Sequence, residues 1–202
     1  MRTNEHRESR RLNIFIQVCG LLTVSLGCSA ILGWIFDSTQ LASFGPNIIP
    51  MALSTAVLFV AFGLIIFYHN RLPSSRIVSW AGIAFSSVGT LAASLLLYYS
   101  LNGILLDAEH LGTKMNRVVD GFVVGHMSPV TAFCFVLVGL SVLIMLTKTA
   151  QNKQLKTSLI FAALVFFISI IILLSYLFGA PLLYGGSFIP PALTTSIAFL
   201  FL

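Results

Sequence analysis

The sequence predicts an all-α integral membrane protein, on the basis of its composition, its long apolar runs and the placement of its basic residues. Hydrophobic residues make up 57% of the 202 residues and charged residues 8%, and the mean hydropathy is +0.99. A soluble domain carries about three times as much charge. The chain is therefore expected to lie in a lipid bilayer.

Five apolar runs are long enough to cross a bilayer, which takes about 20 helical residues. They cover roughly residues 13–36, 50–68, 77–99, 129–147 and 157–178. None of the five contains Asp, Glu, Lys, Arg or His. Each run is therefore expected to form one transmembrane helix.

A sixth run begins at residue 190 and is short for a membrane crossing. From Pro191 to Leu202 is twelve residues, which extend about 18 Å as a helix, whereas the bilayer core is about 30 Å thick. We therefore expect six transmembrane helices, with the sixth truncated and its continuation in the cytoplasm.

The basic residues are divided unevenly between the two sides of these spans. Two of them, Lys114 and Arg117, lie in the third connection. The other nine lie in the tail 1–12 and in the second and fourth connections: Arg2, Arg7, Arg10, Arg11, Arg71, Arg76, Lys148, Lys153 and Lys156. The positive-inside rule then places the N-terminus in the cytoplasm. The net charge of +5 reflects this topology and gives no reason to expect nucleic-acid binding.

Similar segments open the second, fourth and sixth runs. Residues 49–59, "IPMALSTAVLF", match residues 189–199, "IPPALTTSIAF", at a constant offset of 140. A looser copy, "MSPVTAFCFVLVGL" at 127–140, aligns with the first at an offset of 76. We refer to these as the three matching segments. They predict three helical hairpins built on one plan, at 13–68, 77–147 and 157–202.

The matching segments share prolines and a threonine that have two interpretations. Pro50, Pro129, Pro190 and Pro191 are expected at helix starts, where the missing N–H of proline has little cost. Thr55, Thr131 and Thr195 lie about one turn further on, and their hydroxyls can bond a carbonyl one turn back or a neighbouring helix. The structural interpretation is a reused helix start. The functional one is an outer-leaflet pocket at three helix N-termini, which favours an anionic or polar headgroup.

The third connection, residues 100–128, is the longest and carries half of the acidic and half of the histidine side chains. An amphipathic helix on the outer membrane face is predicted by the spacing of Leu105, Leu106, Leu111, Met115 and Val118. Asp107, Glu109, His110 and His126 are candidate metal ligands, but their spacing matches no established motif, and a solvated face is the alternative. His126 is also a candidate ligand-binding residue, and a histidine can respond to acidity.

Other chemistry has little support in the sequence. There is no glycine-rich phosphate loop, nucleophile elbow or HExxH motif, so we expect no enzyme activity, cofactor or metal in this chain. Cys19, Cys28 and Cys134 lie inside apolar runs, as small packing residues do. The interiors of the spans also lack the ionisable groups that ion-coupled transporters use.

Two stretches, "GHMSPVTAFCFVLVGL" at 125–140 and "YLFGAPLLYGGSFIPPALTTSIAFLFL" at 176–202, resemble the N-terminal multi-helix membrane regions of bacterial sensor histidine kinases. Similar regions precede some diguanylate cyclases, often with PAS domains between. The resemblance implies a sensory domain in the bacterial inner membrane. The phosphoacceptor histidine and nucleotide-binding motifs of the kinases are absent, so no catalytic role is carried over.

The sequence thus predicts a membrane sensory module at 13–202 that relays a ligand or membrane-state signal through its last helix to a cytoplasmic output domain. Its expected partners are the lipid bilayer, its own signalling domain and a second copy of the full-length protein. The alternatives are a small transporter or channel subunit, or a passive membrane anchor.

Overall fold

The computed structural model describes most of the chain, apart from short stretches that are mainly in connections. The described residues are 2–43, 45, 48–72, 75–104, 106–110, 118–119, 122–123, 125–147, 152–179 and 189–202. Five of their helices are long and apolar enough to cross a membrane, with spans at Arg10–Ile35, Leu53–Arg71, Arg76–Leu101, Pro129–Leu146 and Asn152–Leu177. These agree with the five apolar runs and support a predominantly helical, multi-pass membrane fold.

The elements follow one another along the chain in this order. Helix α1 (Arg2–Ile35) is followed by the short α2 (Thr39–Ser43), then by α3 (Leu53–Arg71) and α4 (Arg76–Leu101). A 3-10 turn, η1 (Asp107–His110), and a small antiparallel hairpin of β1 (Val118–Val119) and β2 (Phe122–Val123) follow. Then come α5 (Pro129–Leu146), α6 (Asn152–Leu177) and α7 (Leu193–Phe201). The third connection therefore has a turn and a hairpin among its described residues, and Val118 lies in a strand rather than in the expected amphipathic helix.

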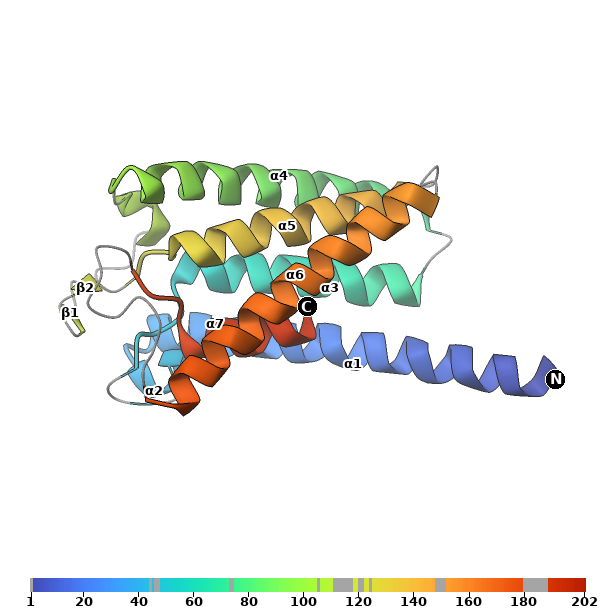
Figure 1. Cartoon of the computed structure of the whole chain (residues 1–202), viewed down its shortest axis with the longest axis horizontal. Coiled ribbons are helices and arrows are strands. Elements are labelled where there is room, and N and C mark those ends of the chain that lie inside the picture. The colour runs from blue at the N-terminus through green and yellow to red at the C-terminus, as the bar shows by residue number, and fades with distance from the viewer. Residues whose placement is uncertain are drawn as a thin grey trace.

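The helices pack mainly as neighbours along the chain. Helix α1 runs beside α3, α4 beside α5, and α6 beside α7, while α6 also packs on α5 and α7 on α1. In Figure 1, α2, β1 and β2 lie together at one end of the bundle, which we call the loop end. The opposite end is called the basic end; Arg71 ends α3 there, Arg76 begins α4, and Lys153 and Lys156 lie near the start of α6. The C-terminal end of α7 lies about midway between them (Figure 1).

Small residues let α1 and α3 approach closely. A Cβ atom at Gly27 would lie 2.8 Å from the carbonyl oxygen of Ala56, and one at Gly63 would lie 3.0 Å from that of Gly20. Both distances are shorter than van der Waals contact, so the two backbones are as near as glycine allows. In a bilayer, where lipid tails are as apolar as side chains, such close packing is a main source of helix association.

Polar side chains join α5 to α6. The hydroxyl oxygens of Ser141 and Ser158 lie 2.8 Å apart, and each hydroxyl lies 3.1 Å from the main-chain oxygen of the other residue. Both serines are buried. Because each hydroxyl has a carbonyl partner on the facing helix, the two polar groups are satisfied where water is absent.

The closest approach of α4 and α5 predicts a position-specific loss of stability. A Cβ at Gly139 would overlap the Oγ1 of Thr90, a buried hydroxyl that donates to the Ser86 carbonyl at 2.6 Å. Gly139→Ala should lower the free energy of unfolding by about 1–3 kcal/mol through overpacking, measured by denaturant titration in mixed micelles. In a Thr90→Ala background the same change should cost less. An equal cost in both backgrounds would contradict this packing.

Candidate functional site

The three matching segments begin their helices in the same backbone conformation. Residues Ala52, Ser128 and Ala192 are the N-caps of α3, α5 and α7, with φ and ψ of −62° and 148°, −68° and 148°, and −67° and 147°. In each, the N-cap carbonyl accepts the backbone N–H four residues later, at 2.9 to 3.2 Å. The N-caps are thus superimposable in local geometry.

The prolines lie on either side of these N-caps. Pro129 is the first residue of α5, as expected for a proline at a helix start. Pro50 and Pro190 instead lie two residues before the N-caps of α3 and α7, and Pro191 lies one residue before. A proline there holds φ near −65° in the extended segment that leads into the helix, so three of the four prolines act before the first helical turn.

The three threonines are buried, with exposures of 1% for Thr55, 3% for Thr131 and 2% for Thr195. Thr131 accepts a hydrogen bond from the Ser128 hydroxyl at 3.0 Å, while its own N–H donates to that hydroxyl at 3.1 Å. Thr131 and Thr195 line one crevice with Cys134 and Phe199, and the crevice is too narrow for water. Thr55 does not line it. The structure therefore brings two of the three threonines together, with no open pocket between them.

One turn further along, a phenylalanine from each matching segment meets the other two. The ring centroids of Phe59 and Phe135 are 4.8 Å apart, those of Phe59 and Phe199 are 4.7 Å apart, and those of Phe135 and Phe199 are 4.8 Å apart. The interplanar angles are 58°, 65° and 58°. These are favourable tilted contacts between aromatic rings. We call the three rings the phenylalanine cluster; it joins α3, α5 and α7 in the centre of the fold.

Two aromatic side chains hold the segments that precede α3 and α7. The indole Nε1 of Trp34, on α1, donates to the carbonyl of Met51 at 2.8 Å. The hydroxyl of Tyr176, on α6, donates to the carbonyl of Pro191 at the same distance, 2.8 Å. Residues 51 and 191 are equivalent at the offset of 140. Sequence reasoning missed these contacts because an aromatic residue near a span end is equally expected as an interfacial anchor.

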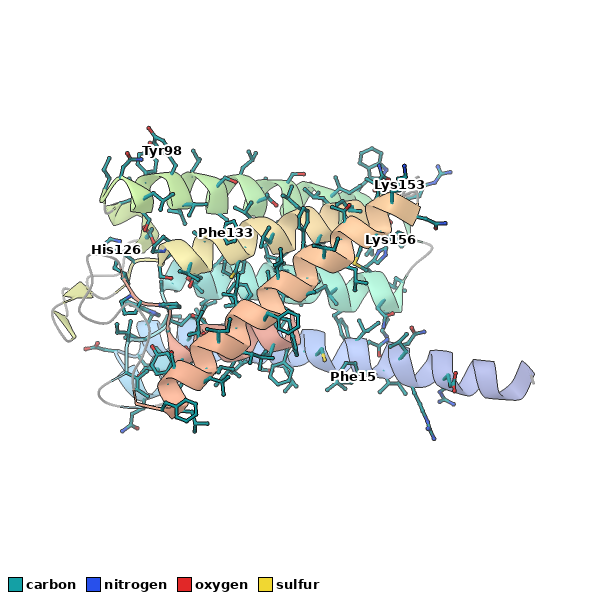
Figure 2. The ribbon with its side chains drawn as sticks, viewed as in Figure 1. Phe15, Tyr98, His126, Phe133, Lys153 and Lys156 are labelled. Carbon is teal, nitrogen blue, oxygen red and sulfur yellow. The ribbon has the colours of Figure 1, made fainter. Side chains whose placement is uncertain are left out.

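The middle segment is held by a buried carboxylate, which contacts the backbone N–H of residue 127 instead of its carbonyl. Glu109, in η1, accepts the backbone N–H of Met127 through Oε2 at 2.5 Å, and its Oε1 lies 3.5 Å from Nδ1 of His126. Both side chains are more than nine-tenths buried. Figure 2 places His126 at the loop end, opposite Lys153 and Lys156. Of the candidate ligand-binding residues, His126 is therefore the one beside an ionisable partner.

The proposed metal ligands are brought together only in part. The structure pairs Glu109 with His126, whereas the side chains of Asp107 and His110 lie outside what it describes. Within the described residues, no group of three or more His, Cys, Asp or Glu side chains is placed to hold a metal ion. The three cysteines are free thiols.

Two cavities lie away from the helix starts. One, of about 450 Å³, has four polar residues in its lining, Asn13, His69, Asn70 and Ser141, and is otherwise lined by apolar side chains of α1, α3, α5, α6 and α7. The other, also of about 450 Å³, is an apolar groove between α3 and α4. Cavities of this size suit small amphiphiles. No sequence pattern could have found the first, since its lining comes from five separate helices.

Comparison with known protein families, curated proteins and solved structures finds no match.

The bond from Tyr176 predicts a stability difference between two otherwise similar changes. Tyr176→Phe leaves the ring in place and removes the donor to the Pro191 carbonyl, so it should cost about 0.5–1.5 kcal/mol of unfolding free energy. Tyr98 is 62% exposed, and Tyr98→Phe is the matched control with little expected effect. Denaturation in mixed micelles measures both. Equal losses in the two variants would show that the bond contributes nothing specific.

Proposed function

We propose that this chain is the membrane-embedded sensory module of a bacterial signal-transduction protein, with a histidine kinase or diguanylate cyclase as its cytoplasmic output. A ligand, lipid or change in membrane state shifts the packing of the bundle, and the last helix relays that shift. The module lies in the inner membrane, and the full-length protein acts as a dimer. The proposal is supported by the resemblance of residues 125–140 and 176–202 to sensor kinase membrane regions and by the contacts of α7.

The observation that carries the proposal is the phenylalanine cluster. Phe199 of α7 contacts Phe59 of α3 and Phe135 of α5, and α7 also packs on α1, α2 and α6. A shift in any of these helices therefore changes the contacts of α7. Packed aromatic clusters pass from one discrete arrangement to another instead of deforming smoothly, which suits a helix that carries a signal.

Three hairpins on one plan, at 13–68, 77–147 and 157–202, are part of this proposal. Supporting it are the matching offsets, the near-identical N-cap geometry and the three nearly equal ring separations of the phenylalanine cluster. If the hairpins are equivalent, α7 is the counterpart of α3 and α5 and belongs to a sixth crossing that returns the chain to the cytoplasm.

The proposed topology puts the basic end in the cytoplasm. Supporting it are the nine basic residues assigned to that side of the membrane and the position of Lys153 and Lys156 at the end of the bundle opposite His126 (Figure 2). Reporter fusions after residues 73 and 152 should report the cytoplasm, and a fusion after residue 112 should report the periplasm. An external signal after residue 152 would exclude this topology.

The reading frame beyond Leu202 tests the class of protein. A frame that continues into PAS, kinase or cyclase sequence supports the sensor. A stop codon within a few residues contradicts it and favours a small transporter or channel subunit. This experiment does not distinguish a sensor from a passive anchor, which calls for a functional assay.

Changes in the phenylalanine cluster should alter output. In the intact signalling protein, Phe135→Leu should change basal kinase or cyclase activity in membrane vesicles by about fivefold or more, the lower end of typical coupling between sites. Phe133 lies on the same helix and is 43% exposed, so Phe133→Leu is the matched control and should leave activity unchanged. Unchanged activity in both variants, at normal expression, would identify a passive anchor.

A further inference from the structure

The apolar groove between α3 and α4 separates two helices that are consecutive in the chain. Helix α3 packs mainly on α1 and α4 mainly on α5, which leaves a space of about 450 Å³ between them. Its lining residues are all apolar except for Tyr68. Several of them, including Leu64, Tyr68 and Phe85, are exposed. The groove therefore opens onto the surface that these helices present to lipid.

The groove has the chemistry and the length that suit a lipid acyl chain. Water does not fill apolar cavities, and a space left empty forfeits the dispersion contacts of its lining. On α3 the lining runs from Val57 to Tyr68, which is about 16 Å along a helix. One leaflet supplies about half of a hydrocarbon core that is roughly 30 Å thick. The groove is thus about as long as an acyl chain in one leaflet.

Positive charge lies where the groove approaches the basic end. Arg71 follows Tyr68 by three residues and so lies on the same face of α3. Arg76 is the first residue of α4, two residues before Val78 of the lining. Both arginines are exposed. Residues 53–101, which comprise α3, α4 and their connection, contain no Asp or Glu, so these helices supply no acidic side chain to neutralise either arginine.

The start of α4 adds the partial charge of its backbone to that of the arginines. Ser75 is the N-cap of this 26-residue helix, and its first turn contains no acidic residue. The N-terminus of a helix carries partial positive charge and stabilises a nearby anion. An anionic group at this end of the groove is therefore attracted both by the helix start and by Arg71 and Arg76.

We propose that the groove binds an anionic glycerophospholipid, with an acyl chain between α3 and α4 and the phosphate at Arg71, Arg76 and the start of α4. Basic sites between transmembrane helices recognise anionic headgroups in this way. The site goes beyond the proposed function and does not require it, since no ring of the phenylalanine cluster lines the groove.

Charge favours a lipid over a second copy of the chain as the occupant. A symmetric dimer brings the same surface of both chains together. Packed through this groove with both chains in the same orientation in the membrane, two copies would place their Arg71 and Arg76 side chains at one level, where like charges repel. An anionic headgroup at the same place is attracted instead.

Native mass spectrometry of the 202-residue chain from detergent micelles measures lipid binding directly. Dioleoyl phosphatidylglycerol should bind about 10- to 30-fold more tightly than dioleoyl phosphatidylcholine, because each arginine near an anionic headgroup contributes roughly fivefold. Arg71→Gln combined with Arg76→Gln should remove this preference. Lys153→Gln combined with Lys156→Gln is the matched control, because it makes the same change in charge at the basic end, on α6, which packs on α5 and α7.

A second pair of variants tests the place of the acyl chain. Ala81 lines the groove, and Ala81→Phe should weaken the binding of both lipids by about tenfold or more, the effect of excluding two or three buried methylene groups. Ala84 is exposed on the same helix and does not line the groove. Ala84→Phe is therefore the matched control and should leave the affinity unchanged.

The unchanged chain decides the outcome even where a variant fails to fold. Equal affinity for the two lipids overturns the proposal. So does a preference that survives in the folded arginine variant, an equal loss in the lysine variant, or undiminished binding to Ala81→Phe. A dimer that forms without lipid and dissociates in Ala81→Phe would assign the groove to a second copy and also overturn it. None of these measurements involves kinase or cyclase output, so the result is independent of the proposed signalling function.

Discussion

The contact of Phe59, Phe135 and Phe199 is the interaction around which the other helices are arranged. The centroid of each ring lies within 4.8 Å of the centroids of the other two. Each ring belongs to a helix whose N-cap has the same backbone geometry. Helices α1, α4 and α6 then lie beside α3, α5 and α7 respectively. In lipid there is little hydrophobic gain from bringing helices together, so well-fitted contacts such as this one determine which helices are neighbours.

A second constraint is that main-chain polar groups must be satisfied at the loop end, where three helices begin and the chain is not helical. The carbonyl of Ala42 accepts both Met51 N–H, at 3.0 Å, and the Thr194 hydroxyl, at 3.3 Å. It thereby ties α2 to the starts of α3 and α7. Trp34 and Tyr176 hold the carbonyls of residues 51 and 191. Buried irregular backbone in a membrane protein is tolerated when neighbouring groups supply its hydrogen bonds.

These two constraints separate the symmetric part of the fold from its exception. The phenylalanine cluster and the N-caps are alike in all three matching segments, whereas the polar partners of the middle segment differ. A carboxylate has replaced a main-chain acceptor there, at the cost of burying an ionisable group. This carboxylate lies where the longest connection meets the start of α5.

The hydropathy of the sequence determined the helical membrane fold and the approximate bounds of its helices, because lipid demands long apolar helices regardless of their neighbours. The offsets of 76 and 140 also make Phe59, Phe135 and Phe199 equivalent positions, although the sequence does not show that their rings meet. The pairing of Glu109 with His126, the bonds from Trp34 and Tyr176, and the cavity lined by five helices were decided by the tertiary structure alone. Each of these contacts joins residues between 15 and about 190 positions apart. Close packing between helices brings such residues together. The spacing of side chains along one helix carries no information about how that helix packs on another.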